Sequence, residues 1–524
     1  MSPFWLTEEM FLGMTYRSIL FLHDKDRLGK EDPEAPEFFT DLNLDQVVQA
    51  ITLGRQQYRL EPYLYTPLTN IDAISYRHEV MKDLESKSLL DAVQGFATAL
   101  NEVRRHLDQA RKLRPRFQFA RWYLDAVSLY CESVSSFVSL LTSIRLDSRG
   151  LVQFRDYATQ TVNTNEFQSM YSEARGLTNR LAAIRYGVRI HGNSVEVHPM
   201  DIMTDYGKEV SKTFARFQHG TVKDYRVKFH DPPQMNSVEE RILDLVATLF
   251  PDTFRALDQY VQSHEHFMDS GILQFDREVQ FYIGYLDVIN TVKRMKLEFC
   301  YPRLTDTSKE ISADSPFDLA LAHKLAEEHG TVVCNDFSLK DPERVFIVSG
   351  PNQGGKTTFA RMVGQLHYLA QLGVPVPGRA AQLFLVDQLF THFEREENAD
   401  NRRSKLEDDL LRMQHILRHA TSRSLLILNE TFSSTSLEDA LFLGRTVLEQ
   451  IASLDAFCVY VTFMDELSEF NASTVSVMST VDPNLPASRT YTIIRRKADG
   501  RAFALSLAER HGLTYDRLKE RIQS

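Results

Sequence analysis

VFIVSGPNQGGKTTFARMV, residues 345–363, decides the fold of the C-terminal part of the chain. The stretch opens with apolar residues suited to a buried strand, and helix-forming residues follow its last glycine. Between them, Gly350, Gly355, Lys356 and Thr357 satisfy the spacing G-x-x-x-x-G-K-[ST] of a phosphate-binding loop. This motif requires a strand before it and a helix after it, and both are present. The sequence therefore predicts a site for a nucleoside triphosphate.

The residue types in this loop explain the prediction. Glycines permit the tight turn in which several backbone N–H groups converge on phosphate oxygens, and the helix that follows presents its positive end to the same anion. We expect Lys356 to reach the β- and γ-phosphates and the Thr357 hydroxyl to bind Mg²⁺. The alternative is a glycine-rich turn without a ligand. The loop residues predicted to bind nucleotide are Gly350, Pro351, Asn352, Gln353, Gly354, Gly355, Lys356, Thr357 and Thr358.

A second apolar run, SLLILNE at residues 424–430, ends in an acid. Glu430 is the predicted general base, because a carboxylate beside the terminal phosphate can orient or deprotonate the attacking water. Asn429 stands where a metal-binding aspartate is usual, and its amide oxygen carries no charge, so Mg²⁺ would be held less strongly. Thr357, Asn429 and Glu430 are the predicted metal-side residues, and Lys356 shares the catalytic role with Glu430. Taken alone, an apolar strand followed by Asn-Glu is a common pattern.

Composition predicts a soluble multidomain protein. The chain has 524 residues, of which 43% are hydrophobic and 25% charged, and domains average about 150 residues. No uninterrupted apolar run approaches the roughly 20 residues that span a bilayer. The start MSPFWLTEEMFLGMTYRS lacks the pattern of a secretory signal. The 4 cysteines are far apart and form no C-x-x-C pair, which predicts reduced thiols. We expect cytoplasmic residence and no membrane contact.

The net charge of −11 argues against a protein that is basic throughout, although a local patch could still contact nucleic acid. RRHLDQARKLRPRFQFARW, residues 104–122, is the strongest candidate for such a patch. Its basic and aromatic side chains could meet phosphates and bases. The alternative is a solvated helix face that ends at Pro115. The residues concerned are Arg104, Arg105, Arg111, Lys112, Arg114, Arg116, Phe117, Phe119, Arg121 and Trp122.

Hydrophobic periodicity changes along the chain. Helical spacing runs from Leu42 to Leu141, and RYGVRIHGNSVEVHP at residues 185–199 predicts a β-hairpin turned at Gly192-Asn193. Ser237 and Glu240 predict a capping box that opens a long helix. From Thr331 onward, short β-branched runs alternate with helices, which indicates an α/β domain. The predicted domains are an N-terminal segment (1–60), a helical core (61–184), a clamp-like region with the hairpin (185–236), returning lever helices (237–330) and an α/β ATPase domain with a C-terminal helical dimerisation segment (331–524).

Several of these stretches together resemble the MutS family of ATPases. GPNQGGKTT at residues 350–358 is similar to the family's distinctive form of the phosphate-binding loop. VCNDFSL, NRRSKLEDDLLRMQHIL, NETFSSTSLEDA and YVTFMDEL follow in the family's order. The resemblance implies that Phe337 lies near the adenine and that Ser404, with Asp409 at the matching acidic position, acts on the nucleotide of a partner subunit. Phe463 stands where the family has a histidine.

The resemblance implies a fold as well as a function. We expect an α plus α/β protein, with a long helical core and lever region followed by a P-loop, ABC-type, MutS-like ATPase domain. ATP, Mg²⁺ and a homodimer joined through the ATPase domains are implied, and DNA is the implied partner. About 60 residues precede the helical core, too few for a mismatch-recognition domain, and no Smr nuclease tail is recognisable. We therefore expect a short MutS-like protein that lacks both.

The leading interpretation is a DNA-binding, nucleotide-gated dimeric clamp that acts in DNA repair or recombination. Asn429 and Phe463 remove a metal-side carboxylate and an imidazole, so hydrolysis is expected to be slow. The same two residues favour an alternative, a nucleotide-gated scaffold that binds structured RNA, a ribosome or a protein and hydrolyses little. A third interpretation is that the helical arm serves only dimerisation.

Overall fold

The computed structural model describes residues 16–23, 34–192, 194–200, 212–214, 235–394, 404–481, 489–497 and 519. These residues form two compact units of mixed helical and α/β structure. Unit 1 comprises residues 1–16, 86–146 and 152–276, and unit 2 comprises residues 17–85, 147–151 and 277–524. The domain limits given above remain predictions.

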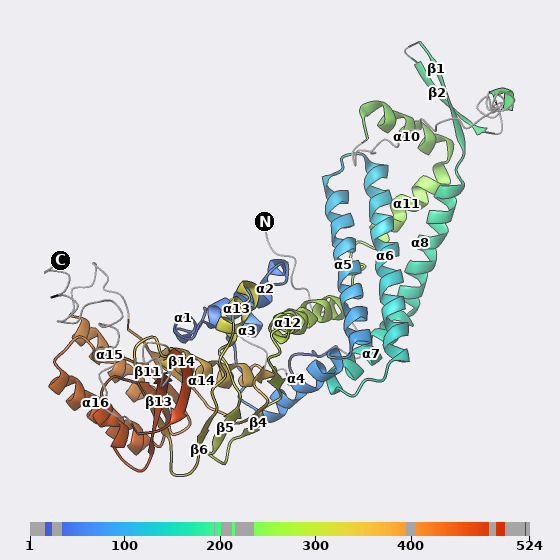
Figure 1. Ribbon diagram of the computed structural model, residues 1–524. Helices are drawn as coiled ribbons and strands as arrows, with labels where there is room; N and C mark the ends of the chain where they lie inside the picture. The colour runs from blue at the N-terminus through green and yellow to red at the C-terminus, as the bar shows by residue number, and fades with distance from the viewer. Residues whose placement is uncertain are drawn as a thin grey trace. The chain divides into compact units, whose positions relative to one another are not determined.

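Unit 1 is built on long helices whose apolar stripes face one another. Three of them, α5 (Lys87–Lys112), α6 (Arg116–Ser143) and α8 (Asn165–Ala183), run side by side (Figure 1). In α5 the buried residues recur three or four positions apart, as the core-facing stripe of a helix requires. Phe96 of α5 stacks on Phe137 of α6 with ring centroids 4.2 Å apart. Helices α7 (Arg149–Val162) and α12 (Ser270–Lys293) contribute residues to both units.

Helix α6 is long and apolar enough to cross a membrane by length and composition alone, and it is the 1 described helix that meets this criterion. Half of its most apolar window is nevertheless buried inside the protein. Tyr130 and Leu124 are fully buried, and core helices of soluble proteins have the same composition. We assign α6 to the core of unit 1, and cytoplasmic residence stays a prediction.

The predicted hairpin is confirmed, but the predicted helix after it needs two corrections. Strands β1 (Tyr186–His191) and β2 (Ser194–Pro199) pair antiparallel. Asn236, not Ser237, caps α10 (Ser237–Leu249), and Glu239 completes the capping box. The predicted long helix is also broken, because Pro251 starts a separate helix, α11 (Pro251–Ser263), where its missing N–H costs nothing. Most of the clamp-like region beyond the hairpin lies outside the described residues.

Unit 2 contains a six-stranded sheet in the order β10-β11-β12-β7-β13-β14. All neighbouring strands are parallel except the pair β13 and β14. The alternation predicted from residue 331 onward is thus present, although the sequence did not predict β10 and β13. The strands are β7 (Val345–Ser349), β10 (Leu389–His392), β11 (Leu425–Asn429), β12 (Phe457–Val461), β13 (Thr474–Val481) and β14 (Arg489–Arg495).

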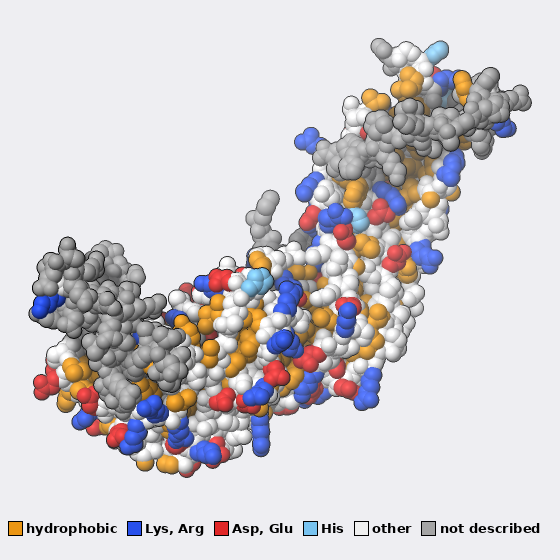
Figure 2. Space-filling model, viewed as in Figure 1, with side chains coloured by type: hydrophobic (Ala, Val, Ile, Leu, Met, Phe, Trp, Pro, Cys, Tyr) orange, Lys and Arg blue, Asp and Glu red, His pale blue; other side chains and the backbone are white. Residues whose placement is uncertain are grey.

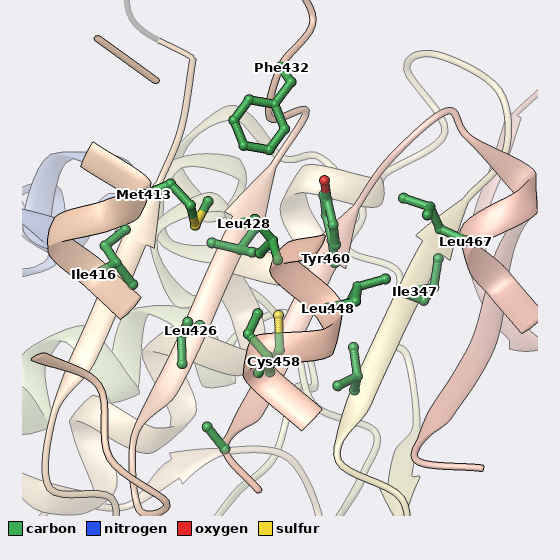
Figure 3. Close-up of a cluster of buried hydrophobic side chains, with 14 of the residues drawn as sticks. Ile347, Met413, Ile416, Leu426, Leu428, Phe432, Leu448, Cys458, Tyr460 and Leu467 are labelled. Atoms are coloured by element: carbon green, nitrogen blue, oxygen red, sulfur yellow. The ribbon is translucent and has the colours of Figure 1, made fainter. Parts of the chain in front are cut away.

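Helices cover both faces of this sheet because the strands are apolar on both sides. Side chains that alternate along the strands, such as Leu426 and Leu428 of β11, pack against α15 (Lys405–His419) and α16 (Leu437–Leu454) on one face (Figure 3). Helix α14 (Lys356–Gln371) packs on the opposite face against β11 and β12. One side of α14, the helix that follows the glycine-rich loop, is therefore buried against the sheet.

Two smaller sheets and several short helices complete unit 2. The sheets have the orders β4-β9-β5-β6 and β3-β8, and β3, β4 and β5 lie where the sequence predicted only lever helices. The strands are β3 (Phe299–Cys300), β4 (Arg303–Thr305), β5 (Ile311–Asp314), β6 (Phe337–Leu339), β8 (Val376–Pro377) and β9 (Ala380–Phe384). The helices are α1 (Phe38–Asp41), α2 (Leu44–Thr52), η2 (Gln56–Tyr58), α3 (Glu61–Tyr65), α4 (Ile71–Leu84), α13 (Leu319–Glu328) and η4 (Asp465–Glu469).

An extended segment near the N-terminus is buried in unit 2 by side-chain hydrogen bonds. Ser18, Ile19 and Leu20 are at most 1% exposed. Glu278 of α12 accepts 2.8 Å hydrogen bonds from the Ser18 hydroxyl and the Ile19 N–H, and the Arg77 Nε of α4 donates to the Leu20 carbonyl at 2.8 Å. Buried backbone groups need such partners, so this segment is part of the core that the sequence alone did not reveal.

Two buried histidines should make unit 2 sensitive to acid. Burial lowers the pKa of His78 and His367 from the usual 6.5 to about 4. In the unfolded chain these histidines become protonated below about pH 6.5, whereas in the folded chain they stay neutral until about pH 4. The folded state is therefore less stable relative to the unfolded state as the pH falls through this range. We expect the free energy of unfolding to drop by about 2 kcal/mol per histidine between about pH 7.5 and pH 5.

Urea unfolding at the two pH values measures this loss. The matched control is His367→Gln, which removes one titrating group and should reduce the pH dependence whatever its absolute stability. An unchanged pH dependence in this variant would contradict the assignment to His367.

Candidate functional site

The predicted site residues come from loops at one edge of the six-stranded sheet. The glycine-rich loop, residues 350–357, follows β7, while Asn429 ends β11 and Glu430 directly follows it. Phe463 follows β12, and Glu394 follows β10. Because the carboxyl ends of parallel strands meet at one edge, residues far apart in sequence gather there, and this edge is where open α/β sheets bind ligands.

The glycine-rich loop needs glycine for both its backbone angles and its packing. Gly350 and Gly355 have φ angles of 115° and 91°, which residues with a side chain rarely adopt. A Cβ on Gly354 would lie 2.3 Å from the Ser479 Oγ of β13. The loop therefore rests directly on β13, and the first N–H groups of α14, which have no acceptor within the helix and no side-chain cap, are available to an anion.

The Lys356 ammonium lies across the inside of this loop. Its Nζ donates to the carbonyls of Gly350 at 2.9 Å and Pro351 at 3.2 Å, and to the Asn352 Oδ1 at 3.3 Å. Burial lowers the pKa of Lys356, whereas the Glu430 carboxylate raises it. The cation thus contacts the loop carbonyls and interacts electrostatically with the predicted base. The oxygens that accept from Lys356 are uncharged, so an anionic phosphate would form stronger hydrogen bonds and would replace them.

The hydroxyl and amide predicted to face the metal are in direct contact. Thr357 Oγ1 donates to Asn429 Oδ1 at 3.0 Å. Glu430 follows in a left-handed conformation, with φ 52°, and its N–H donates to the Val461 carbonyl at 2.9 Å. Backbone strain of this kind persists only where surrounding structure enforces it. The result is a hydroxyl and an amide oxygen in contact, next to a glutamate whose backbone is fixed.

Ser404 directly precedes α15, and Asp409 lies within it. Ser404 is exposed, and its Oγ caps the helix by accepting from the Glu407 N–H at 3.2 Å. Asp409 is buried 3.5 Å from the Nε2 of the buried His392, and burial raises the pKa of its carboxyl. The action of Ser404 on a partner's nucleotide stays a prediction.

Phe337 and Phe463 occupy opposite environments. Phe337 is 6% exposed and packs edge-to-face with Phe346 at 6.0 Å and Phe359 at 6.3 Å. It also lines a cavity of about 880 Å³ with Asn335. Phe463 is 52% exposed beside the site and offers no hydrogen-bond donor. The predicted adenine contact of Phe337 stays a prediction.

The sequence analysis missed several residues at this edge. Ser479 of β13 lies under the loop, while Arg489 of β14 donates to the Asn352 carbonyl at 3.2 Å. Glu394 accepts from the Ser433 hydroxyl at 3.3 Å and pairs with Lys405, which lowers the pKa of its carboxyl. The alternating run TVSVMSTV was the available signal for β13, but nothing in sequence placed it beside residues 350–357.

Metal ligands and basic residues elsewhere were also considered. Among the described residues, no group of three or more His, Cys, Asp or Glu side chains could hold a metal ion. The basic segment at residues 104–121 is largely neutralised by acids, in the pairs Arg104–Asp276, Arg105–Glu102, Arg111–Asp108, Arg116–Asp258 and Arg121–Asp125. Figure 2 shows basic and acidic side chains interspersed over the visible face. The solvated-face interpretation of this segment is therefore favoured.

The fold and site define an α/β domain with a glycine-rich loop at the edge of its sheet where the parallel strands end. Residues 346–513 match the family model of MutS domain V. The chain is 31% identical over 195 residues to the DNA mismatch repair protein MSH4 of Arabidopsis thaliana, and 29% identical over 239 residues to the DNA mismatch repair protein MutS of Orientia tsutsugamushi (strain Ikeda).

These findings support a protein of the MutS family, with the similarity centred on the C-terminal part of the chain. The two alignments cover 37% and 44% of this chain, but 23% and 26% of the two relatives. The chain thus spans about a quarter of the length of the curated relatives it matches, and the family resemblance found in the sequence is confirmed.

Proposed function

We propose that this chain is an ATP-binding and ATP-hydrolysing protein whose nucleotide state controls its binding to DNA. The observation that carries the proposal is the convergence of Lys356, the Thr357–Asn429 pair and Glu430 at one sheet edge. Members of the MutS family are ATPases that use ATP and Mg²⁺. Loop N–H groups and Lys356 would hold the phosphates, and Glu430 would orient the attacking water.

The residues at this sheet edge fit both the phosphates of ATP and Mg²⁺. The loop has no room for a side chain at Gly354. It offers the first N–H groups of α14 and the buried Lys356 ammonium as donors, which suit a phosphate. Thr357 and Asn429 supply oxygen ligands, which suit Mg²⁺, an ion that commonly takes the rest of its ligands from phosphate and water. Bound Mg²⁺ would neutralise charge on the phosphates. Asn429 would hold it without adding a charge.

We expect Asn429→Asp to raise the affinity of the site for Mg²⁺. A carboxylate next to the Thr357 hydroxyl adds one negative charge to the ligand set, and divalent-ion affinity rises with ligand charge. The Mg²⁺ concentration for half-maximal ATP turnover should fall by about tenfold. Asn429→Ala is the control, because it removes the oxygen and should raise that concentration. Equal Mg²⁺ dependence in all three proteins would place the metal elsewhere.

DNA and a second copy of the chain are the proposed partners. The two relatives are named DNA mismatch repair proteins, which supports a role in DNA repair or recombination. Family members form dimers, and exposed apolar residues on α16 supply a surface for one, since Leu437 is 55% and Phe442 is 69% exposed. Two ATPase domains joined there would form a nucleotide-gated clamp, with Ser404 acting across the junction.

A second candidate function is a nucleotide-gated scaffold for RNA or protein with little hydrolysis. The uncharged Asn429 and the donor-free Phe463 favour it. It shares the nucleotide site with the first proposal but predicts that DNA has no effect. The two functions therefore differ in their ligand and in their turnover.

The test measures ATP turnover and DNA affinity on the same purified chain. Fluorescently labelled duplex, branched and mismatched DNA is titrated at fixed salt with ATP, with ADP and without nucleotide. We expect the dissociation constant for DNA to change at least severalfold with the nucleotide, and DNA to change the rate of hydrolysis. Nucleotide binding with neither response would contradict the DNA function and leave the scaffold.

A further inference from the structure

Two serine hydroxyls beside the glycine-rich loop are fully buried and have no hydrogen-bond partner among the residues that the structure describes. Ser349 is the last residue of β7, and Ser479 lies on the neighbouring strand β13, directly after the residue that pairs with Ser349. A buried hydroxyl without a partner costs free energy, and buried polar groups in native proteins nearly always have one. Two such hydroxyls on adjacent strands at the site therefore need an explanation.

The two hydroxyls lie on opposite faces of the sheet. Successive side chains of a strand point to opposite faces, and paired residues of neighbouring strands share a face. Ser349 shares its face with Val345 and Ile347, which belong to the core formed with α15 and α16 (Figure 3). Ser479 follows the partner of Ser349, so it points to the other face, where it meets the glycine-rich loop. Of the two, only Ser479 is placed to act on the loop.

The Ser479 hydroxyl lies next to a loop carbonyl to which it is not bonded. A Cβ on Gly354 would lie 2.3 Å from the Ser479 Oγ and 2.8 Å from the Pro351 carbonyl oxygen. The hydroxyl and the carbonyl therefore border the same small space, which the glycine leaves open. Pro351 is itself buried, so water has little access to this carbonyl. The structure thus places an unused donor beside a buried acceptor.

Lys356 is the side chain that occupies this carbonyl in the ligand-free loop. Its Nζ donates to the carbonyls of Pro351 at 3.2 Å and Gly350 at 2.9 Å. A phosphate would draw the ammonium away, because charge-assisted hydrogen bonds to an anion are stronger than those to a carbonyl. The buried Pro351 carbonyl would then lose a donor, and buried carbonyls need one. Ser479 is the neighbouring side chain with a donor to give.

We propose that Ser479 is a positioning residue whose hydroxyl donates to the Pro351 carbonyl when Lys356 leaves that carbonyl for phosphate. The inference rests on the proposed nucleotide binding and adds the residue that stabilises the phosphate-bound form of the loop. The Pro351 carbonyl keeps a side-chain donor in both forms, so moving the ammonium to phosphate leaves no buried acceptor unpaired. Ser479 touches no ligand and acts through the loop. Its unpaired hydroxyl in the ligand-free protein is the cost of this exchange.

Thermal unfolding without ligand tests the exchange of donors. In the parent chain the Ser479 hydroxyl has no described partner, so Ser479→Ala should keep or raise the Tm. In a Lys356→Met background the carbonyl is left to Ser479, and the same replacement should lower the Tm by about 2 °C. Ser349→Ala is the matched control, because it removes an equally buried hydroxyl from the opposite face and should have the same effect in both backgrounds. Equal effects of Ser479→Ala in the two backgrounds would overturn the proposal.

Ligand titration tests the consequence for binding. ATP and inorganic tripolyphosphate are titrated into the parent chain, Ser479→Ala and Ser349→Ala. We expect Ser479→Ala to bind both ligands about fivefold more weakly, since only the phosphate-bound loop uses the hydroxyl, and Ser349→Ala to bind them as the parent does. If the parent binds both ligands and Ser479→Ala binds them equally well, only the role of Ser479 is wrong. If the parent binds neither ligand, the proposed nucleotide function is wrong and the role of Ser479 falls with it.

Discussion

Replacing Lys356 with methionine should weaken ATP binding by about 100-fold or more. The Lys356 ammonium is the buried cation of the glycine-rich loop, and the residue is only 5% exposed. Hydrogen bonds to charged groups contribute about 1.5–3 kcal/mol each, and the lysine would make them to phosphate oxygens in place of the Gly350 and Pro351 carbonyls. Methionine keeps the aliphatic stem and its packing. Calorimetric titration of ATP into the parent and the variant measures the difference.

The stability of the ligand-free proteins is the control for this substitution. Bound ligand raises stability by RT ln(1 + [L]/Kd), so excess ATP should raise the Tm of the parent and leave that of the variant almost unchanged. Without nucleotide, the two Tm values should lie close together. An ATP-induced increase of equal size in both proteins would show that phosphate binds elsewhere.

Replacing Glu430 with glutamine should lower ATP turnover by about 100-fold or more while ATP affinity stays within about threefold. General bases contribute about 10²–10⁴ in rate, and glutamine has the same size but cannot accept the proton. Glu430 is fixed by its left-handed backbone and by its N–H bond to the Val461 carbonyl. Single-turnover hydrolysis combined with equilibrium binding separates the chemical step from affinity.

Glu394 offers a matched control at the same sheet edge. It is also a carboxylate after a parallel strand, but it is engaged by Ser433 and Lys405. Glu394→Gln should change turnover by no more than a few-fold. Equal losses in both variants would mean that the negative charge of this edge matters, and not a base at Glu430. Normal turnover in Glu430→Gln would remove Glu430 from the mechanism.

The part of the site that could be predicted from sequence is the part built from contiguous residues. A phosphate-binding loop needs glycines, a lysine and a hydroxyl at fixed spacing within one strand-to-helix turn, so residues 350–358 carry the whole signal. The acidic end of β11 was found the same way, because its apolar run is uninterrupted. Thr357 and Asn429 then lie close together because the carboxyl ends of parallel strands meet at the same edge of the sheet.

The residues that sequence reasoning missed come from segments in which no local pattern marks a residue as part of the site. β13 alternates too weakly to stand out, and its Ser479 matters only because the loop rests on it. The first helix-cap prediction was wrong by one residue because Asn236 and Ser237 are both good caps and only the backbone decides between them.

By itself the sequence determined the α/β class of the C-terminal region, the glycine-rich loop, the predicted base and amide at the end of β11 and the resemblance to the MutS family, because each is encoded in a short run of residues. Only the tertiary structure decided which distant residues complete the edge, among them Ser479 and Arg489, and that Ser18–Leu20 belongs to the core of unit 2. Strand order, register and long-range burial arise from packing between segments far apart in the chain, which no local pattern of residues specifies.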